Sequence, residues 1–263
     1  MSSNFIVKNL YFKDILKDIN FNLEKGTINV LMGKNGSGKT LLFKCLFGLV
    51  ESEGIISIND VIVTKENLEE MRKKIGIYLG LNTLEDKNVF LNIMEPLINL
   101  NYEHAKAKKK VYEISKKLGI ENLLYKDIKT LSNSQKKIVS FAQSVIHEPK
   151  VILVDGLFES LDTYYKYKII NFFTQMKKVK KSIILFTTNN SEDLNFADSL
   201  LIIKNGKILV SGILEELVQY ESLFSKNDIK LPFLIDLSYK LKVYNIIDRL
   251  IYDEDEMVDD IWQ

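Results

Sequence analysis

The sequence predicts an α/β fold in which a mostly parallel sheet is covered by helices. Two patterns carry this prediction. Short apolar runs alternate with longer segments of helical spacing over residues 150–220, and a glycine-rich loop, GKNGSGKT at 33–40, joins an apolar strand to an apolar helix. The 263 residues, 46% of them hydrophobic, are enough for one large domain with an appendage.

The first 80 residues are expected to form short strands separated by turns. Apolar and polar residues alternate in NFIVKNL and DINFNL, as they do in half-buried strands, and the apolar run TINVLMG follows a turn at EKG. The strands are predicted at residues 4–10, 18–23, 27–33, 54–60 and 73–80.

Residues from about 84 to 145 change to helical spacing. The expected helices lie at 90–100, 105–120 and 134–148, with Pro96 as the one interior break. Alternation of strand and helix then returns, with predicted elements at 150–155, 165–179, 181–189, 199–212 and 213–220.

From about residue 222 the pattern changes again. The segment 231–251 starts near a proline and places Leu234, Leu237 and Leu241 at helical spacing, and the acidic run DEDEMVDDIWQ closes the chain. This part is too short for an independent domain and too apolar for a free tail. We therefore expect it to dock on another surface.

Bulk properties exclude several classes of function. The single Cys45 is expected to be a free core cysteine and excludes a disulfide framework or a thiolate metal site. No stretch approaches the roughly 20 apolar residues of a membrane helix. The net charge of +1 argues neither for nor against a polyanionic partner, and we expect no nucleic-acid partner. His104 and His147 have no metal-ligating partner at suitable spacing, and the lysines at 106–110 and 116–117 are expected on a solvated helix face.

The glycine-rich loop predicts a phosphate-binding site. Its glycines allow backbone N–H groups to face phosphates, and the N-terminus of the following helix adds a partial positive charge. In this pattern Lys39 reaches the β- and γ-phosphates, and the hydroxyl of Thr40 is offered to Mg²⁺. The expected binding residues are Gly33, Lys34, Asn35, Gly36, Ser37, Gly38, Lys39, Thr40 and Leu41. The loop alone leaves kinases, GTPases and ATPases open.

Two later motifs narrow the choice. LSNSQKK at 131–137 precedes the strand VILVD, which ends at Asp155, and SLD at 160–162 follows that strand. With these motifs in this order, residues 4–220 resemble the nucleotide-binding subunits of ABC transporters. The resemblance implies a P-loop NTPase fold of ABC type, with an N-terminal antiparallel β subdomain and an inserted helical subdomain at about 84–145. It divides the chain into a nucleotide-binding domain, 1–221, and a short C-terminal extension, 222–263.

The resemblance also implies that ATP and Mg²⁺ bind in a head-to-tail dimer. ATP lies between the phosphate loop of one subunit and the signature segment of the other, to which Ser132 and Gln135 belong. These two residues form a capping-box pattern, so a helix is expected to start there. Further residues that the resemblance places at the nucleotide are Thr40 and Asp155 on the metal, Tyr11 or Phe12 on the adenine ring, Asp162 in the SLD loop, and Asn189 at the γ-phosphate sensor.

Several positions depart from the family pattern. Gly156 stands where the family has the glutamate that polarises water, Asn189 replaces the switch histidine, and Gly80 replaces a glutamine; Asn133 and Ser134 replace the signature glycines. We therefore assign no catalytic residue. The chain is expected to bind Mg·ATP well and to hydrolyse it poorly by itself, so the sequence leaves open whether it is an enzyme.

The C-terminal extension resembles that of the ATPases of energy-coupling factor (ECF) transporters, which import vitamins or metal ions. This similarity implies a peripheral subunit at the cytoplasmic face of the cell membrane, with the extension as a dimerisation element. The implied partners are a second, catalytically intact ATPase, a transmembrane coupling protein that docks near residues 80–100, and a small substrate-binding membrane protein. Two alternatives remain: the ATP-binding subunit of a peptide or drug exporter, and an ATP-dependent dimerisation switch without a transport role.

Overall fold

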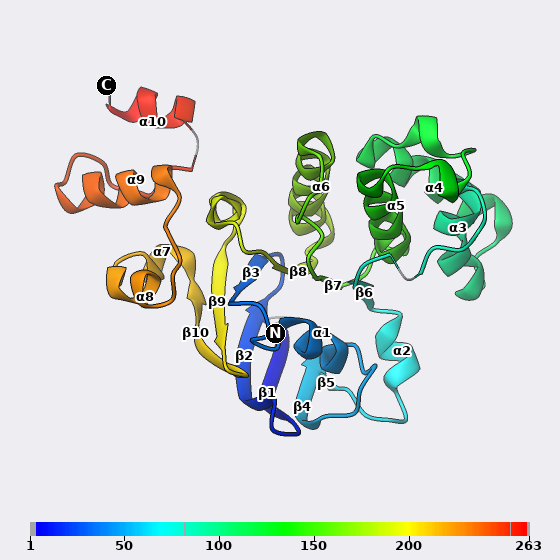
Figure 1. Ribbon diagram of the computed structural model, residues 1–263, viewed down its shortest axis with the longest axis horizontal. Helices are drawn as coiled ribbons and strands as arrows, with labels where there is room; N and C mark the ends of the chain where they lie inside the picture. The colour runs from blue at the N-terminus through cyan, green and yellow to red at the C-terminus, as the bar shows by residue number, and fades with distance from the viewer. Residues whose placement is uncertain (1–3, 82, 253, 262–263) are drawn as a thin grey trace.

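The computed structural model describes residues 4–81, 83–252 and 254–261 and contains two sheets with helices packed around them (Figure 1). The larger sheet has six strands in the order β10-β9-β3-β8-β7-β6, of which only β10 pairs in antiparallel fashion. This mostly parallel sheet confirms the predicted α/β class. Its strands are β3 (Ile28–Met32), β6 (Ile75–Tyr78), β7 (Val151–Val154), β8 (Ile183–Thr187), β9 (Ser199–Lys204) and β10 (Lys207–Ile213).

The smaller sheet is antiparallel and comes from the N-terminal part of the chain. It has the order β2-β1-β4-β5, and the alternating sequence of β2 is reflected in alternating buried and exposed side chains. The strands are β1 (Asn4–Phe12), β2 (Leu16–Glu24), β4 (Glu53–Ile58) and β5 (Val61–Ile62).

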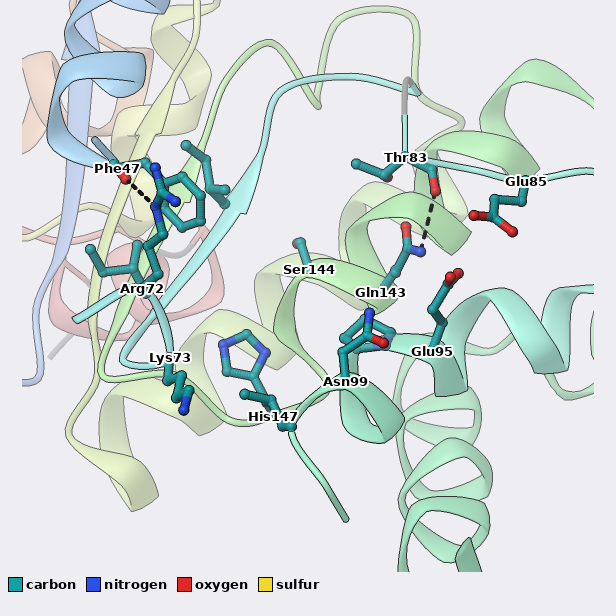
Figure 2. A pocket seen from close by; sticks show the side chains of 14 residues that line it. Phe47, Arg72, Lys73, Thr83, Glu85, Glu95, Asn99, Gln143, Ser144 and His147 are labelled. Atoms are coloured by element: carbon teal, nitrogen blue, oxygen red, sulfur yellow. Dashed lines mark hydrogen bonds between the residues drawn. The ribbon is translucent and has the colours of Figure 1, made fainter. Parts of the chain in front are cut away.

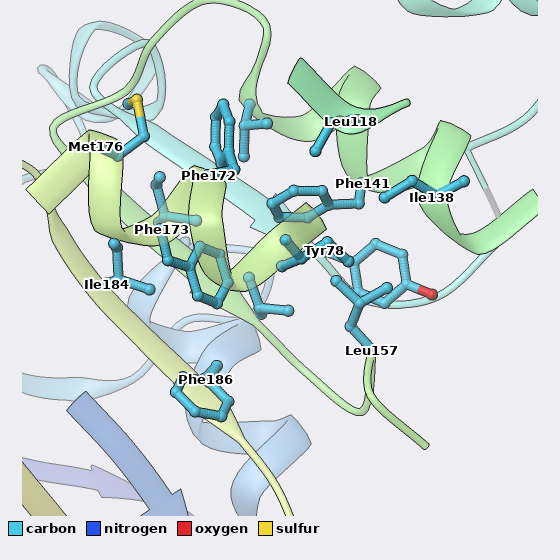
Figure 3. Close-up of a cluster of buried hydrophobic side chains, with 14 of the residues drawn as sticks. Tyr78, Leu118, Ile138, Phe141, Leu157, Phe172, Phe173, Met176, Ile184 and Phe186 are labelled. Carbon is cyan, nitrogen blue, oxygen red and sulfur yellow. The ribbon is translucent and has the colours of Figure 1, made fainter. Parts of the chain in front are cut away.

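The larger sheet separates two hydrophobic cores. Successive residues of a strand point to opposite faces, so Ile184 and Phe186 of β8 join one core while Ile183 and Leu185 join the other. The first core packs against the helices that follow β6 and β7, and Figure 3 shows its aromatic centre, with Phe141, Phe172, Phe173 and Phe186. The second core lies between the larger sheet, helix α1 and the antiparallel sheet. Burial on both faces explains why these strands are apolar throughout.

A group of three helices lies at one end of the molecule (Figure 1). Its members are α3 (Val89–Asn99), α4 (His104–Leu118) and α5 (Asn133–Val145). The predicted break at Pro96 is wrong, because α3 continues through this residue. The proline removes one hydrogen bond close to the end of the helix, and the fully buried neighbours Ile93 and Leu97 hold the helix in place.

The last helices lie at the opposite end of the molecule (Figure 1). They are α7 (Leu214–Leu217), α8 (Glu221–Lys226), α9 (Phe233–Val243) and α10 (Glu254–Ile261). The residues of α9 that the structure buries are Ile235 and Ser238, whereas Leu234, Leu237 and Leu241 are only half-buried. The predicted apolar stripe is therefore not the face that packs inside this chain. Asp253, Trp262 and Gln263 of the predicted acidic end lie outside the described residues.

The remaining helices connect the sheets. The helix predicted after the glycine-rich loop is α1 (Lys39–Leu46), and α6 (Thr163–Gln175) continues into a π-helical segment at Met176–Lys180. Helix α2 (Leu68–Arg72), barely more than one turn long, is not predicted from the sequence. Short 3₁₀ segments occur at Glu121–Leu123, Ile128–Thr130 and Ser191–Phe196. Within the part of the chain that the structure describes, no helix combines the length and apolarity needed to cross a membrane.

The thiol of Cys45 is expected to be unreactive in the folded protein. Cys45 is buried in α1, and burial raises the pKa of its thiol to about 11. Because only the thiolate is nucleophilic and about one thiol in a thousand is ionised at pH 8, iodoacetamide should label the folded chain far more slowly than the unfolded one. The unfolded thiol ionises near pH 8.5 and the folded one near 11, so folding stability should fall as the pH rises across this interval. Rapid labelling under native conditions would contradict this prediction.

Candidate nucleotide-binding site

The loop between β3 and α1 adopts a conformation that requires glycine. Gly36 and Gly38 have φ angles of 80° and 106°, in the left-handed region that favours this residue. At Gly33 the requirement is steric, since a Cβ atom there would lie 2.3 Å from the carbonyl oxygen of Ile203. The loop therefore packs closely on β9 and ends at the N-terminus of α1, where free backbone N–H groups favour an anion.

Lys39, the first residue of α1, spans the loop. Its ammonium group donates to the carbonyl oxygens of Gly33 and Lys34, so it lies among the backbone groups that would surround a phosphate. Burial lowers the pKa of Lys39, while the carboxylates of Asp155 and Glu159 act in the opposite direction. These groups line a pocket of about 490 Å³, whose other residues include Gly36, Gly38, Thr40, Leu41, Gly156 and Thr187.

Asp155 follows β7 and faces the start of α1. The hydroxyl of Thr40 donates to Oδ2 of Asp155, and the hydroxyl of Thr187 donates to Oδ1 at 2.7 Å. The N–H of Gly156 donates to Thr187 in turn, at 2.8 Å, so both carboxylate oxygens are fixed. Thr40 and Asp155 thus present a hydroxyl and a carboxylate side by side, which are oxygen ligands of the kind that Mg²⁺ prefers. The pKa of the nearby Tyr78 is raised to about 12, mainly by burial and to a smaller extent by the charge of Asp155.

Two of the departures from the family pattern lie close to this pocket. Gly156 lines it, with a φ of 64°. Asn189 comes two residues after β8, and its side-chain amide donates to Oε1 of Glu159 at 3.1 Å. Glu159 itself lines the pocket. The third departure, Gly80, is not among the described residues that line it; its carbonyl oxygen accepts a hydrogen bond from Ser140 at 2.8 Å.

The segment around Ser132 forms the predicted capping box. The hydroxyl of Ser132 accepts from the N–H of Gln135 at 3.2 Å, and the Gln135 side chain accepts from the N–H of Ser132 at 3.0 Å. Neither residue is among the described residues that line the pocket. Ser134 links this helix start to the SLD segment by accepting from the N–H of Asp162 at 3.1 Å. Ser132, Gln135 and Asp162 therefore lie together on a surface separate from the phosphate loop.

Replacing Ser132 with alanine should lower the free energy of unfolding by about 1 kcal/mol, because the N–H of Gln135 loses its capping acceptor. Urea denaturation measures this change. Replacement of Ser222, an exposed serine near the start of the much shorter helix α8, serves as the control and should have a smaller effect. Equal effects at both positions would show that the capping box contributes no particular stability.

Comparisons with known proteins show the family to which this chain belongs. The sequence model of the family described as ABC transporter matches residues 16–158. The energy-coupling factor transporter ATP-binding protein EcfA1 of Mesomycoplasma hyopneumoniae is 30% identical over 258 residues, which cover 95% of this chain and 91% of that protein. The chain belongs to the ABC transporter family.

Two further similarities involve another ATP-binding protein and a solved structure. The phosphonates import ATP-binding protein PhnC of Fusobacterium nucleatum is 33% identical over 217 residues, covering 77% of this chain and 88% of that protein. The solved structure of cbiO1 from Clostridium perfringens, described as part of the ABC transporter complex cbiONQ, superposes with a TM-score of 0.74 at 25% identity. The superposed part covers 88% of this chain and 97% of the cbiO1 chain. The predicted ABC-type fold is thus confirmed.

The structure adds residues to the pocket that the sequence analysis did not name. Thr187 reaches it from the end of β8, Glu159 from the residue just before the SLD segment, and Ile15 from the turn between β1 and β2. Of the two residues expected at the adenine ring, Tyr11 is 41% exposed on β1 and Phe12 packs on the second core. Neither is among the described residues that line the pocket. The large apolar side chain of Ile15 in a turn could have indicated that it lines the pocket. Exposed apolar residues are, however, common on protein surfaces.

Proposed function

We propose that this chain is the ATP-binding subunit of an ECF-type importer and acts peripherally at the cytoplasmic face of the cell membrane. The observation that carries the ATP-binding part is the convergence of the phosphate loop, Lys39 and the Thr40–Asp155 pair on one pocket. The similarity to EcfA1 over nearly the whole chain supports the ECF assignment. The substrate class proposed for the assembled importer is a vitamin or a metal ion.

Mg²⁺ would be held by Thr40 and Asp155. Their hydrogen bond brings the two oxygen atoms together, and Thr187 leaves Oδ2 of Asp155 facing α1 by engaging Oδ1. Mg²⁺ binds in proteins through few side chains and completes its shell with water and phosphate oxygens, so two protein oxygens suit it. When bound, the ion would neutralise charge on the phosphates of ATP.

We propose that hydrolysis at this pocket is slow. Position 156 has no carboxylate and position 189 has no imidazole, whereas the phosphate-binding groups are present. Loss of the general base from its usual position can cost up to about 10²–10⁴ in rate, or roughly 3–6 kcal/mol of barrier. In a head-to-tail dimer, the surface formed by Ser132, Gln135 and Asp162 would then complete the pocket of a second ATPase. That partner would keep the glutamate that this chain lacks at position 156, and it would hydrolyse most of the ATP.

A second groove, separate from the phosphate-binding pocket, is the proposed docking site for the transmembrane coupling protein (Figure 2). It lies between α2, β6, α3 and α5 and has a volume of about 410 Å³. Apolar surface from residues such as Ile77 and Leu100 adjoins charged groups that include Arg72 and Glu95. An amphipathic helix with an apolar face and charged edges fits such a groove.

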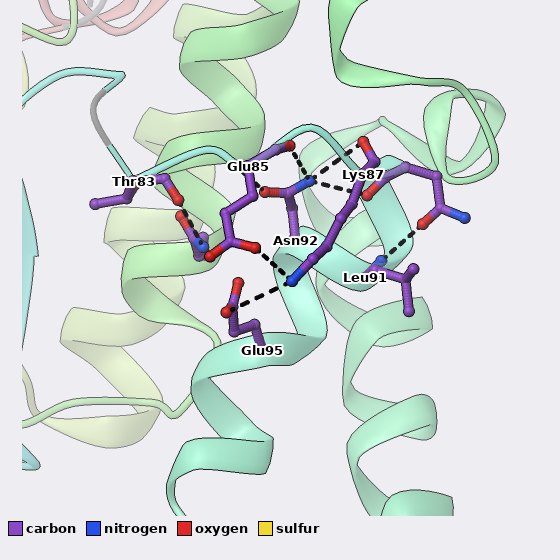
Figure 4. A network of polar contacts seen from close by, with 8 residues as sticks. Thr83, Glu85, Lys87, Leu91, Asn92 and Glu95 are labelled. Atoms are coloured by element: carbon purple, nitrogen blue, oxygen red, sulfur yellow. Dashed lines mark hydrogen bonds and ion pairs between the residues drawn. The ribbon is translucent and has the colours of Figure 1, made fainter.

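The rim of this groove is held by a polar network (Figure 4). Asn92 of α3 is fully buried, and its side chain accepts from the N–H of Glu85 at 2.8 Å and donates to the Glu85 carbonyl at 3.1 Å. The side chain of Lys87 forms ion pairs with Glu85 and Glu95. The segment before α3 is therefore fixed to the helix, so the groove exists without a bound partner.

The C-terminal extension is the proposed dimerisation element. Phe233 and Tyr244, at the two ends of α9, are 71% and 76% exposed, and Leu234, Leu237 and Leu241 are half-buried. Exposed apolar side chains gathered on one element favour an interface with another protein. Asp228 also pairs with Lys34 of the phosphate loop at 2.7 Å, so the extension contacts the nucleotide-binding loop.

Purification of the tagged chain from its native membrane, with identification of the bound proteins, tests this proposal. We expect a second ATPase with a glutamate after its aspartate-bearing strand, a transmembrane coupling protein and a small substrate-binding membrane protein. Recovery of a transmembrane exporter subunit instead would favour the exporter alternative. Recovery of a homodimer without membrane proteins would favour the ATP-dependent switch.

A further inference from the structure

The carboxylate of Glu159 occupies the space in front of Gly156. A Cβ atom built on Gly156 would meet only two heavy atoms within 4 Å among the described residues, Oε2 and Cδ of Glu159, at 3.9 and 4.0 Å. A side chain at position 156 would therefore begin next to this carboxylate. Glu159 lines the same pocket as Lys39, Thr40 and Asp155.

Contacts from two other elements hold Glu159 in this position. The amide of Asn189 donates to Oε1 at 3.1 Å, and this bond leaves Oε2 as the oxygen nearer to Gly156. The side chain of Lys137 from α5 donates to the Glu159 backbone carbonyl. The next residue, Ser160, has a φ of 54°, so the chain turns sharply after Glu159. The carboxylate is thus positioned by the residue at 189 and by the local backbone.

We propose that Glu159 is the general base for the slow ATP hydrolysis of this pocket and that Asn189 is its positioning residue. The inference rests on the proposed ATP-binding function. As the oxygen of a water molecule forms a bond to the γ-phosphorus, the Glu159 carboxylate accepts a proton from that water. The bond between the γ-phosphorus and the β,γ-bridging oxygen breaks, and its electron pair leaves with ADP. The proton then passes to solvent, so ATP and water give ADP, phosphate and a proton.

Single-turnover hydrolysis with the full-length chain in excess over radiolabelled Mg·ATP tests the proposed base. Glu159→Gln preserves the shape of the side chain and removes its basicity, so it should lower the rate constant about tenfold or more. The affinity for Mg·ATP, measured by calorimetry, should be unchanged or up to about tenfold tighter, because a negative charge near the phosphates is removed. Glu216→Gln, which removes an exposed carboxylate of α7, is the matched control and should change neither quantity.

Each outcome decides between the proposals. Equal hydrolysis by the wild-type and Glu159→Gln chains, with intact ATP binding, would overturn the role of Glu159 and leave the ATP-binding function standing. Wild-type hydrolysis no faster than the uncatalysed reaction would also overturn it. Absence of ATP binding by the wild-type chain would instead refute the proposed function itself.

A double-mutant cycle tests the role of Asn189. Asn189→Ala should lower the single-turnover rate about threefold to tenfold, because the orientation of the carboxylate is lost. In the Glu159→Gln background the same change should have no further effect, since the two residues act as a unit. Fully additive losses would overturn the positioning role, because they would show that Asn189 acts independently of Glu159.

Discussion

Replacement of Lys39 with alanine is expected to weaken Mg·ATP binding about 10- to 150-fold. Lys39 provides a charged donor at the phosphate loop, and a charge-assisted hydrogen bond contributes roughly 1.5–3 kcal/mol. Its ammonium group already lies against the carbonyls of Gly33 and Lys34 and lines the pocket, so the loss should appear in the affinity itself. Calorimetry with the full-length chain measures the dissociation constant.

The same helix offers a matched control. Lys44 is exposed on α1, so Lys44→Ala removes an equal charge at a distance from the loop. This variant should bind Mg·ATP within about twofold of the wild type, because exposed charges are screened by solvent and salt. If both variants lost affinity equally, general electrostatic attraction would explain binding and the specific role of Lys39 would be wrong.

Replacement of Phe173 with alanine is expected to lower the free energy of unfolding by about 3–5 kcal/mol. Phe173 of α6 is fully buried, and its ring packs against Phe141 and Phe186 with centroids 5.8 and 5.9 Å away (Figure 3). The ring of Phe158 lies 6.2 Å from it. The change removes apolar contacts and leaves a cavity between α5, α6 and the sheet, where packing is too dense to collapse fully.

Urea denaturation of the two chains measures this loss as a shift of the transition midpoint. Tyr167→Ala on the same helix is the control, since this ring is 62% exposed and its removal should change stability by about 0.5 kcal/mol or less. A similarly small effect at Phe173 would show that the aromatic cluster is not a main source of stability.

Local motifs made the nucleotide-binding loop predictable. The glycines at 36 and 38 need left-handed backbone angles, and the following apolar segment forms α1, because both properties depend on neighbouring residues. The capping box of Ser132 and Gln135 was predictable for the same reason, since its partners are three residues apart. The predicted break at Pro96 failed because tertiary packing of Ile93 and Leu97 outweighed the local preference.

The sequence by itself determined the α/β class, the phosphate loop and the missing carboxylate at position 156, because each depends on residue type and short spacing. Only the tertiary structure brought distant residues into the pocket. The parallel register that pairs Val154 with Phe186 places Asp155 beside Thr187, and the segment after β8 brings Asn189 to Glu159. Strand order and register are set by the whole core, so no local pattern around Glu159 predicts a carboxylate in front of Gly156.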